Sequence, residues 1–279
     1  KGPCNVSAQT QDEFQPGLEI KSILVVHAFE GNAPIFLETD RGLSDRLNSV
    51  GISGQNIFFE SLDLRRNPSP DHRELLVEQM RVRYGHRKLD VIITMYPEAL
   101  EFVLKDCGDL LPDAPIIALY LPQSFDVSDK GRRIIGHFPT FDIAGTLEIA
   151  LKLVPNVKRV YVLNGAHEVD KMLEAQARRD LKKWETRLEF LYLGHLPLEE
   201  MLVAISGTPP GSIILSFGFA RDVTGKDQTS TEVTQRLSRV ATAPIFGILG
   251  VTLGHGIVGG SLISFEHIGK NAGDLALNL

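Results

Sequence analysis

The sequence predicts an α/β protein of two Rossmann-like lobes, each a parallel sheet flanked by helices, joined by a hinge. Two observations predict this fold. Short, continuously apolar runs alternate with helical segments, which is typical of parallel strands covered on both faces. The alternation stops in a polar stretch at residues 123–133 and restarts after Pro139, so a second lobe of the same kind is expected.

Size and composition agree with a protein that has a sizeable core. A chain of 279 residues with 43% hydrophobic and 23% charged residues is long enough for two domains of about 100–150 residues. The net charge of −6, without a long basic run, argues against nucleic acid as a partner. No signal peptide or membrane span is visible, and the start at Lys1 without a methionine leads us to expect a trimmed or mature form.

Lobe one is expected to begin after a flexible tail at residues 1–20. Its strands are the short apolar runs at 22–27, 56–60, 89–94, 115–120 and 134–138. Its first helix carries Phe36, Leu37, Leu43 and Leu47 on one face and ends at Gly51. Further helices are expected around Leu76 and at 98–106, where Pro97 separates strand from helix.

Lobe two repeats the pattern. Apolar periodicity predicts helices at 142–153, 167–184, 197–205 and 231–240. Continuously apolar runs predict strands at 158–163, 188–193, 212–217 and 244–246.

A glycine-rich stretch follows the last of these strands. Gly254, Gly256 and Gly259 spell G-x-G-x-x-G, but that pattern holds a dinucleotide only where a helix follows it, and here residues 261–265 read as a strand. We therefore interpret the stretch as the return crossover between lobes, with His255 at the hinge or pocket edge and a terminal helix at 268–279.

This interpretation divides the chain into domains. Lobe one comprises residues 21–136 plus about 257–279, and lobe two comprises residues 137–256.

Two stretches resemble a known family. Leu-Lys-Leu-Val-Pro-Asn-Val-Lys-Arg-Val-Tyr-Val-Leu-Asn at 151–164 resembles the start of the second lobe in ABC-type solute-binding proteins of the type I periplasmic fold, a group with tryptophan- and other amino-acid-binding members. Residues 256–265 and the terminal helix are similar to that family's return segment. Residues 217–222 and 253–261 resemble still more closely the extracellular sensor domains of bacterial histidine kinases that share this fold.

Candidate binding residues follow from the geometry of parallel sheets, whose ligands lie outside the carboxyl ends of the strands. Two such lobes that face each other would share one cleft lined by aromatic faces and a few polar groups. The residues that we single out at these positions are His27, Phe29, Thr94, Tyr96 and Tyr120 in lobe one, Asn164, Phe217 and Arg221 in lobe two, and Thr252 and His255 on the returning segment.

Several of these residues also have a structural explanation. Phe29 and Phe217 are typical core side chains at strand ends, and Asn164 with Gly165 is a common turn pair. Arg221 either forms a surface ion pair with Asp222 or grips a ligand carboxylate with its planar guanidinium.

Catalysis, metal binding and cofactors are not expected. The sequence has neither a G-x-S-x-G elbow nor a P-loop, and its eight histidines are scattered. Cys4 and Cys107 fit no metal or redox spacing, and whether they pair is left open.

The resemblance implies a small organic ligand bound outside the cytoplasm, with hinge closure around it. In the sensor interpretation the protein continues past Leu279 into a membrane-tethered kinase; the alternative is the solute-binding protein of an ABC transporter, which presents its ligand to a permease. A cytoplasmic effector-binding regulator of the same fold is a weaker third option. The ligand and a homodimer are left open.

Overall fold

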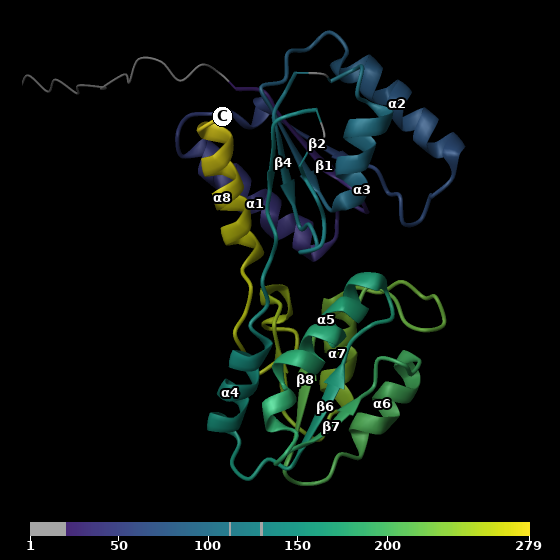
Figure 1. Ribbon diagram of the computed structural model, residues 1–279, viewed down its shortest axis with the longest axis vertical. Coiled ribbons are helices and arrows are strands. Elements are labelled where there is room, and N and C mark those ends of the chain that lie inside the picture. Colours follow the sequence, from purple (N-terminus) through teal and green to yellow (C-terminus); the bar gives the residue numbers. More distant parts are fainter. Residues whose placement is uncertain (1–20, 112, 129–130) are drawn as a thin grey trace, which may run out of the picture.

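Two parallel sheets organise the residues described by the computed structural model, which are 21–279 without 112 and 129–130. The first sheet has the strand order β2-β1-β3-β4-β5, and the second has the order β7-β6-β8-β9. Figure 1 shows them as separate lobes, each covered by helices. The predicted tail at 1–20, and Cys4 within it, lie outside the described residues.

Lobe one alternates strands and helices as its apolar pattern predicts. Its strands are β1 (Ile23–His27), β2 (Ile57–Ser61), β3 (Val91–Met95), β4 (Ile116–Leu119) and β5 (Ile134–Gly136). Its helices are α1 (Pro34–Asn48), α2 (Pro70–Tyr84) and α3 (Pro97–Glu101), the last continuing into the π-helical turn η2 (Phe102–Asp106). A 3₁₀ turn, η1 (Gly54–Asn56), precedes β2.

Lobe two repeats the alternation. Its strands are β6 (Arg159–Leu163), β7 (Glu189–Tyr192), β8 (Ser212–Ser216) and β9 (Ile245–Gly247). Its helices are α4 (Ile143–Leu153), α5 (Glu168–Asp180), α6 (Leu198–Ser206) and α7 (Ser230–Val240), with 3₁₀ turns η3 (Lys182–Trp184) and η4 (Gly250–Thr252). The chain ends in α8 (Phe265–Leu277), which is drawn in yellow beside α1 of lobe one (Figure 1).

The central strands explain why continuous apolar runs predicted this sheet. Every residue of β1 and β3 is buried, because helices cover both faces of the sheet. The parallel register pairs His27 with Ser61 of β2 and with Met95 of β3. The carboxyl ends of these three strands therefore lie side by side.

Two details of the predicted elements are wrong. Leu37 is 54% exposed, because the buried face of α1 runs through Phe36, Thr39, Leu43 and Leu47 instead. Residues 261–265 are no strand: Ile263 forms only an isolated bridge to Leu249, and Phe265 already begins α8.

The glycine-rich stretch lies against β9 before the chain leaves lobe two. Gly247 donates its N–H to the carbonyl of Gly259 (3.0 Å), and a Cβ on Gly260 would lie 2.0 Å from the carbonyl oxygen of Gly247. Residue 260 has to be glycine here, since any side chain would collide with backbone.

Thr146 connects the segments that enter and leave lobe two. Its buried hydroxyl accepts a hydrogen bond from the N–H of Ser261 (3.0 Å) and lies 3.5 Å from the carbonyl oxygen of Gly247. Thr146 stands on α4, directly after the first crossing at residues 137–142, while Ser261 begins the return to α8. The Thr146 side chain thus links the segment that enters lobe two to the segment that returns to lobe one.

Close helix packing fixes α8 on lobe one. A Cβ on Gly42 of α1 would lie 2.0 Å from the carbonyl oxygen of Glu266, and a Cβ on Gly269 of α8 would lie 2.0 Å from that of Thr39. The two backbones approach more closely than side chains allow. The predicted division into lobes stays a prediction, and this contact supports it.

Two further observations concern the whole described chain. Among the described residues, no helix is long and apolar enough to cross a membrane. Cys107 is buried, and burial raises the pKa of its thiol to about 12.

Replacing Gly269 by alanine should lower the free energy of unfolding by about 1–3 kcal/mol, because the new methyl group overpacks the contact between α1 and α8. A loss of stability would be informative, because alanine in a helix interior is otherwise more stable than glycine by about 1 kcal/mol. Urea unfolding measures the change. Gly54→Ala is the control, because nothing lies within 4 Å of a Cβ there. Equal stability of Gly269→Ala and the wild type would contradict this packing.

Candidate functional site

An aromatic cluster stands at the carboxyl ends of the lobe-one strands. Tyr96 and Tyr120 come directly after β3 and β4, and Phe29 lies two residues after the end of β1. The Tyr96 ring lies 5.2 Å from the Phe29 ring and 5.5 Å from the Tyr120 ring, centroid to centroid. The structure therefore brings together three of the residues that the sequence singled out.

The backbone of both tyrosines is strained. Tyr96 has φ = 75° and Tyr120 has φ = 62°, and a positive φ of this kind costs a non-glycine residue on the order of 1–3 kcal/mol. Such residues cluster at functional sites, where the surrounding structure enforces them. The positive φ turns each chain sharply at the strand end and directs the ring into the cluster.

The two hydroxyl groups differ in their environment. Tyr120 is buried and shares a short hydrogen bond with the hydroxyl of Thr39. Tyr96 is only partly buried, and within the described part of the chain its hydroxyl has no hydrogen-bond partner. Burial raises the pKa of Tyr96 to about 12, so the phenol is neutral and can both donate and accept.

Arg65 covers the outer side of this cluster. Its guanidinium carbon lies 4.1 Å from the centre of the Phe29 ring, a cation–π contact, and Nη1 lies 3.6 Å from Oε1 of Glu30. The Arg65 side chain is 15% exposed and forms no hydrogen bond to another described residue. Arg65 is not among the residues predicted from the sequence; the signal that could have found it is a pair of arginines just after the second strand.

In lobe two, hydrogen bonds join the loops that follow β6 and β8. Gly165 donates to the carbonyl of Gly218 (3.1 Å), and Ala166 donates to that of Arg221 (2.6 Å). A Cβ on Gly165 would lie 2.2 Å from Oδ2 of Asp170, so the two loops close tightly over this carboxyl.

Asp170 is a buried carboxyl beneath these loops. It stands in the first turn of α5, is 2% exposed and accepts a hydrogen bond from the N–H of Ala220 (2.9 Å). Burial raises its pKa to about 6, although backbone N–H groups of Ala220, His167 and Arg221 favour the ionised form. The sequence analysis missed Asp170, since a lone acid in a helix carries no pattern.

Charges act across the space between the lobes. The positive charge of Arg65, in lobe one, favours the ionised form of Asp170 and adds to burial in lowering the pKa of His167, both in lobe two. The positive charge of Arg65 lowers the pKa of the Tyr96 hydroxyl. The negative charges of Asp170, Glu98 and Glu30 raise it. The strand-end loops of the two lobes therefore lie within electrostatic range of each other.

Buried polar atoms without a partner gather in the same loops. They are Oε2 of Glu30, Oε2 of Glu98, Nε of Arg65 and Oγ1 of Thr94 in lobe one, and Oδ1 of Asn164 and Nδ1 of His167 in lobe two. Buried polar atoms normally have hydrogen-bond partners, so such a cluster needs an explanation. A polar ligand would satisfy these atoms.

The remaining predicted residues lie outside the cluster of Phe29, Tyr96 and Tyr120. His27 is buried, stacks on Phe36 at 4.6 Å between centroids and pairs its Nε2 with Oδ1 of Asp40 (3.0 Å). Thr94 and Phe217 are buried in their lobes. Thr252 donates its hydroxyl hydrogen to the carbonyl of Leu249 (2.7 Å).

His255 and Arg221 also have partners of their own. The amide of Gln235 on α7 lies 2.7 Å from Nδ1 of His255, and neither His255 nor Thr252 contacts the aromatic cluster within the described residues. The expected ion pair of Arg221 with Asp222 is wrong: Arg221 pairs with Asp227, Nε to Oδ1 at 2.7 Å. Asp222 instead accepts from Thr224 and from the N–H of Lys226.

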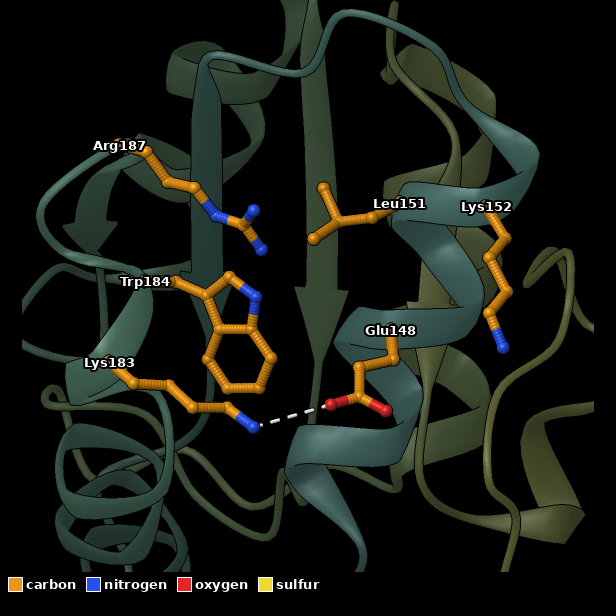
Figure 2. Close-up of a pocket in the computed structure, with 6 residues that line it drawn as sticks. All are labelled: Glu148, Leu151, Lys152, Lys183, Trp184 and Arg187. Atoms are coloured by element: carbon orange, nitrogen blue, oxygen red, sulfur yellow. Dashed lines mark hydrogen bonds and ion pairs between the residues drawn. The ribbon is translucent and has the colours of Figure 1, made fainter.

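Two hollows lie away from the strand ends. Figure 2 shows one of about 480 Å³ between α4 and η3, where Nζ of Lys183 lies 3.3 Å from Oε1 of Glu148 and 4.0 Å from the centre of the Trp184 ring. The other, of about 550 Å³, lies between α2 and η2 beside Arg73 and Asp106. In the described residues, no group of three or more His, Cys, Asp or Glu side chains is placed to hold a metal ion.

No family model matches the sequence, and no curated protein matches it. Solved structures do match across nearly the whole chain. An ABC domain in complex with L-Trp from Streptococcus pneumonia is 13% identical, with a TM-score of 0.63 over 93% of this chain and 84% of that chain. An ABC sugar transporter (periplasmic sugar binding protein) from Legionella pneumophila is 14% identical, with a TM-score of 0.60 over 92% and 94%.

A chain of the XylFII–LytSN complex is 14% identical, with a TM-score of 0.55 over 93% of each chain. At such identities the likeness shows the fold alone. The predicted fold, two parallel α/β lobes of the periplasmic-binding-protein kind, is confirmed.

The pKa of Asp170 predicts a pH-dependent stability. Because the folded pKa, about 6, exceeds the ordinary value of 3.8, the folded state binds the proton more tightly than the unfolded chain does. The stabilisation is complete below pH ~4 and is lost as the pH rises through about 6, by up to about 3 kcal/mol.

Chemical denaturation of the wild type and Asp170→Asn from pH 4 to pH 8 measures this effect. Other titrating groups cancel in the difference between the two proteins. The free energy of unfolding of the wild type should fall relative to the variant up to about pH 7 and then stay level. A difference that rises with pH, or does not change, would contradict the burial of an Asp170 carboxyl.

Proposed function

We propose that this protein binds a small organic ligand in a cleft between its lobes, outside the cytoplasm, without chemical conversion of the ligand. The observation that carries this proposal is that charged groups of both lobes act on the hydroxyl of the partly buried Tyr96, at the end of a lobe-one strand. Buried polar atoms without a hydrogen-bond partner among the described residues stand at or beside the strand ends of both lobes. This combination of aromatic faces and a few convergent polar groups is typical of small-molecule sites.

Closure of the lobes is the proposed response. A ligand that contacts only one lobe has equal affinity for the open and the closed form, so it does not change the equilibrium between them. A ligand that contacts Tyr96 in lobe one and Asn164 in lobe two binds the closed form more tightly. The proposed hinge consists of the crossings held together at Thr146: the first at residues 137–142, and the return that begins at Ser261.

The ten predicted residues take different parts in this proposal. Phe29, Tyr96, Tyr120 and Asn164 are the proposed contacts, while His27 and Thr94 support them from below. Phe217, Arg221, Thr252 and His255 remain proposed lining residues of the second lobe and its returning segment.

The preferred role is that of the sensor domain of a two-component signalling protein, with a membrane-linked kinase as partner. The match to a chain of the XylFII–LytSN complex supports the use of this fold in an assembly with another protein. The alternative is the solute-binding protein of an ABC transporter, which the L-Trp complex and the sugar-binding protein favour. A kinase domain after Leu279 in the gene supports the first role, and a neighbouring permease gene supports the second.

A thermal-shift screen against amino acids, sugars, organic acids and amines tests the binding itself. A ligand at 100 times its Kd should stabilise the protein by about 2.7 kcal/mol. Tyr96→Ala and Asn164→Ala should each weaken the affinity by about tenfold or more, since they remove a ring contact and a buried hydrogen bond.

A matched pair of variants isolates the free hydroxyl. Tyr96→Phe removes a group without a partner, whereas Tyr84→Phe removes a hydroxyl that is bound to Glu60, outside the aromatic cluster. Only Tyr96→Phe should change the affinity. Unchanged affinity in both alanine variants would refute the proposed site.

A further inference from the structure

The charges around Tyr96 are unbalanced. Three carboxyl groups, those of Glu30, Glu98 and Asp170, and one guanidinium, that of Arg65, act on its hydroxyl. Another cation of the strand-end loops, Arg221, is held in a two-pronged pair with Asp227. The space in front of the Tyr96 ring therefore has a negative excess.

Two of these carboxyl groups have spare acceptor capacity. Oε2 of Glu30 and Oε2 of Glu98 are buried and have no hydrogen-bond partner among the described residues. Glu98, one residue past Pro97, forms no ion pair within the described residues either. The negative charge of Glu168, in lobe two, adds to burial in raising the pKa of Glu98. In lobe two, Oδ1 of Asn164, a residue 1% exposed, is a third acceptor without a partner among the described residues.

Arg65 shows what kind of group fits this space. Its guanidinium lies over the Phe29 ring and beside Glu30, but the 3.6 Å ion-pair distance is too long for a hydrogen bond. An aromatic face beside carboxylates is the arrangement that recognises organic cations. The protein thus holds one of its own cations loosely on a cation-binding surface.

We propose that the ligand is an organic cation, an amine whose ammonium group replaces the Arg65 guanidinium on Phe29 and donates hydrogen bonds to Glu30 and Glu98. The inference rests on the proposed function, because it names the ligand class of that same cleft. Displaced from the ring, Arg65 swings toward solvent on its flexible stem, and the apolar part of the amine packs on Tyr96.

An anionic ligand gripped by Arg65 is the opposite assignment. It would bring a further negative charge beside three carboxyl groups and would leave the acceptors of Glu30, Glu98 and Asn164 without donors. The two assignments predict opposite signs for one substitution, Arg65→Met, which keeps an unbranched stem of similar shape and removes the guanidinium with its charge.

Isothermal titration at pH 8 of the whole chain with matched probes tests the proposal. The probes are benzylamine and butylamine, with benzyl alcohol, butanol, benzoate and butyrate as neutral and anionic counterparts. At this pH the amines are protonated and Asp170 is ionised. We expect the amines to bind and their counterparts to bind at least about tenfold more weakly, the loss of a hydrogen bond to a charged group.

Arg65→Met should raise the affinity for the amines by about 3–10-fold, because the internal cation–π contact no longer has to be broken. Arg66→Met is the matched control: Arg66 is 61% exposed, pairs with Asp63 in the same loop and should have no effect. Glu98→Gln should weaken amine binding by about tenfold or more, whereas Glu101→Gln, which removes an exposed carboxylate paired with Lys105, should not.

The possible results separate the cation assignment from the proposed function. Weaker amine binding by Arg65→Met, or binding of the carboxylates alone, overturns the cation assignment; if that binding still depends on Tyr96, the proposed function stands. Binding of none of the probes, together with no stabilisation in the wider thermal-shift screen, overturns both.

Discussion

The hydrogen bonds around Thr146 are the constraint on which the arrangement of the lobes depends. They join the segment that enters lobe two to the segment that leaves it, at a point where Gly260 lies too close to Gly247 for any side chain. Because the crossings are tied together, relative motion of the lobes is confined to a narrow region and leaves both cores intact. Close packing of α8 on α1 returns the end of the described chain to lobe one.

The aromatic cluster is in direct contact with this hinge. The Tyr120 ring lies 6.1 Å from the ring of His137, which begins the first crossing, and 5.9 Å from that of Phe265, which begins α8. On its other side Tyr120 contacts Tyr96. The ring that a ligand would touch and the two ends of the hinge thus belong to one packed group, so a ligand that repositions Tyr96 acts where the lobes turn.

The sequence predicted the fold well because parallel strands buried on both faces leave an unmistakable signal, as β1 and β3 show. It failed at residues 261–265, since an apolar run cannot reveal whether its backbone pairs along a strand or at one bridge. Tyr96 and Tyr120 were found because they directly follow strands. Arg65 and Asp170 were missed because only the folded chain brings residue 65 near residue 170.

Solution X-ray scattering with and without the most stabilising ligand tests the central claim, that a ligand between the lobes closes them, most directly. The account predicts a smaller radius of gyration in the ligand complex, and no such decrease in Tyr96→Ala at the same ligand concentration. A ligand that binds in a Tyr96-dependent manner while the radius of gyration of the wild type stays the same would contradict closure about the Thr146 hinge.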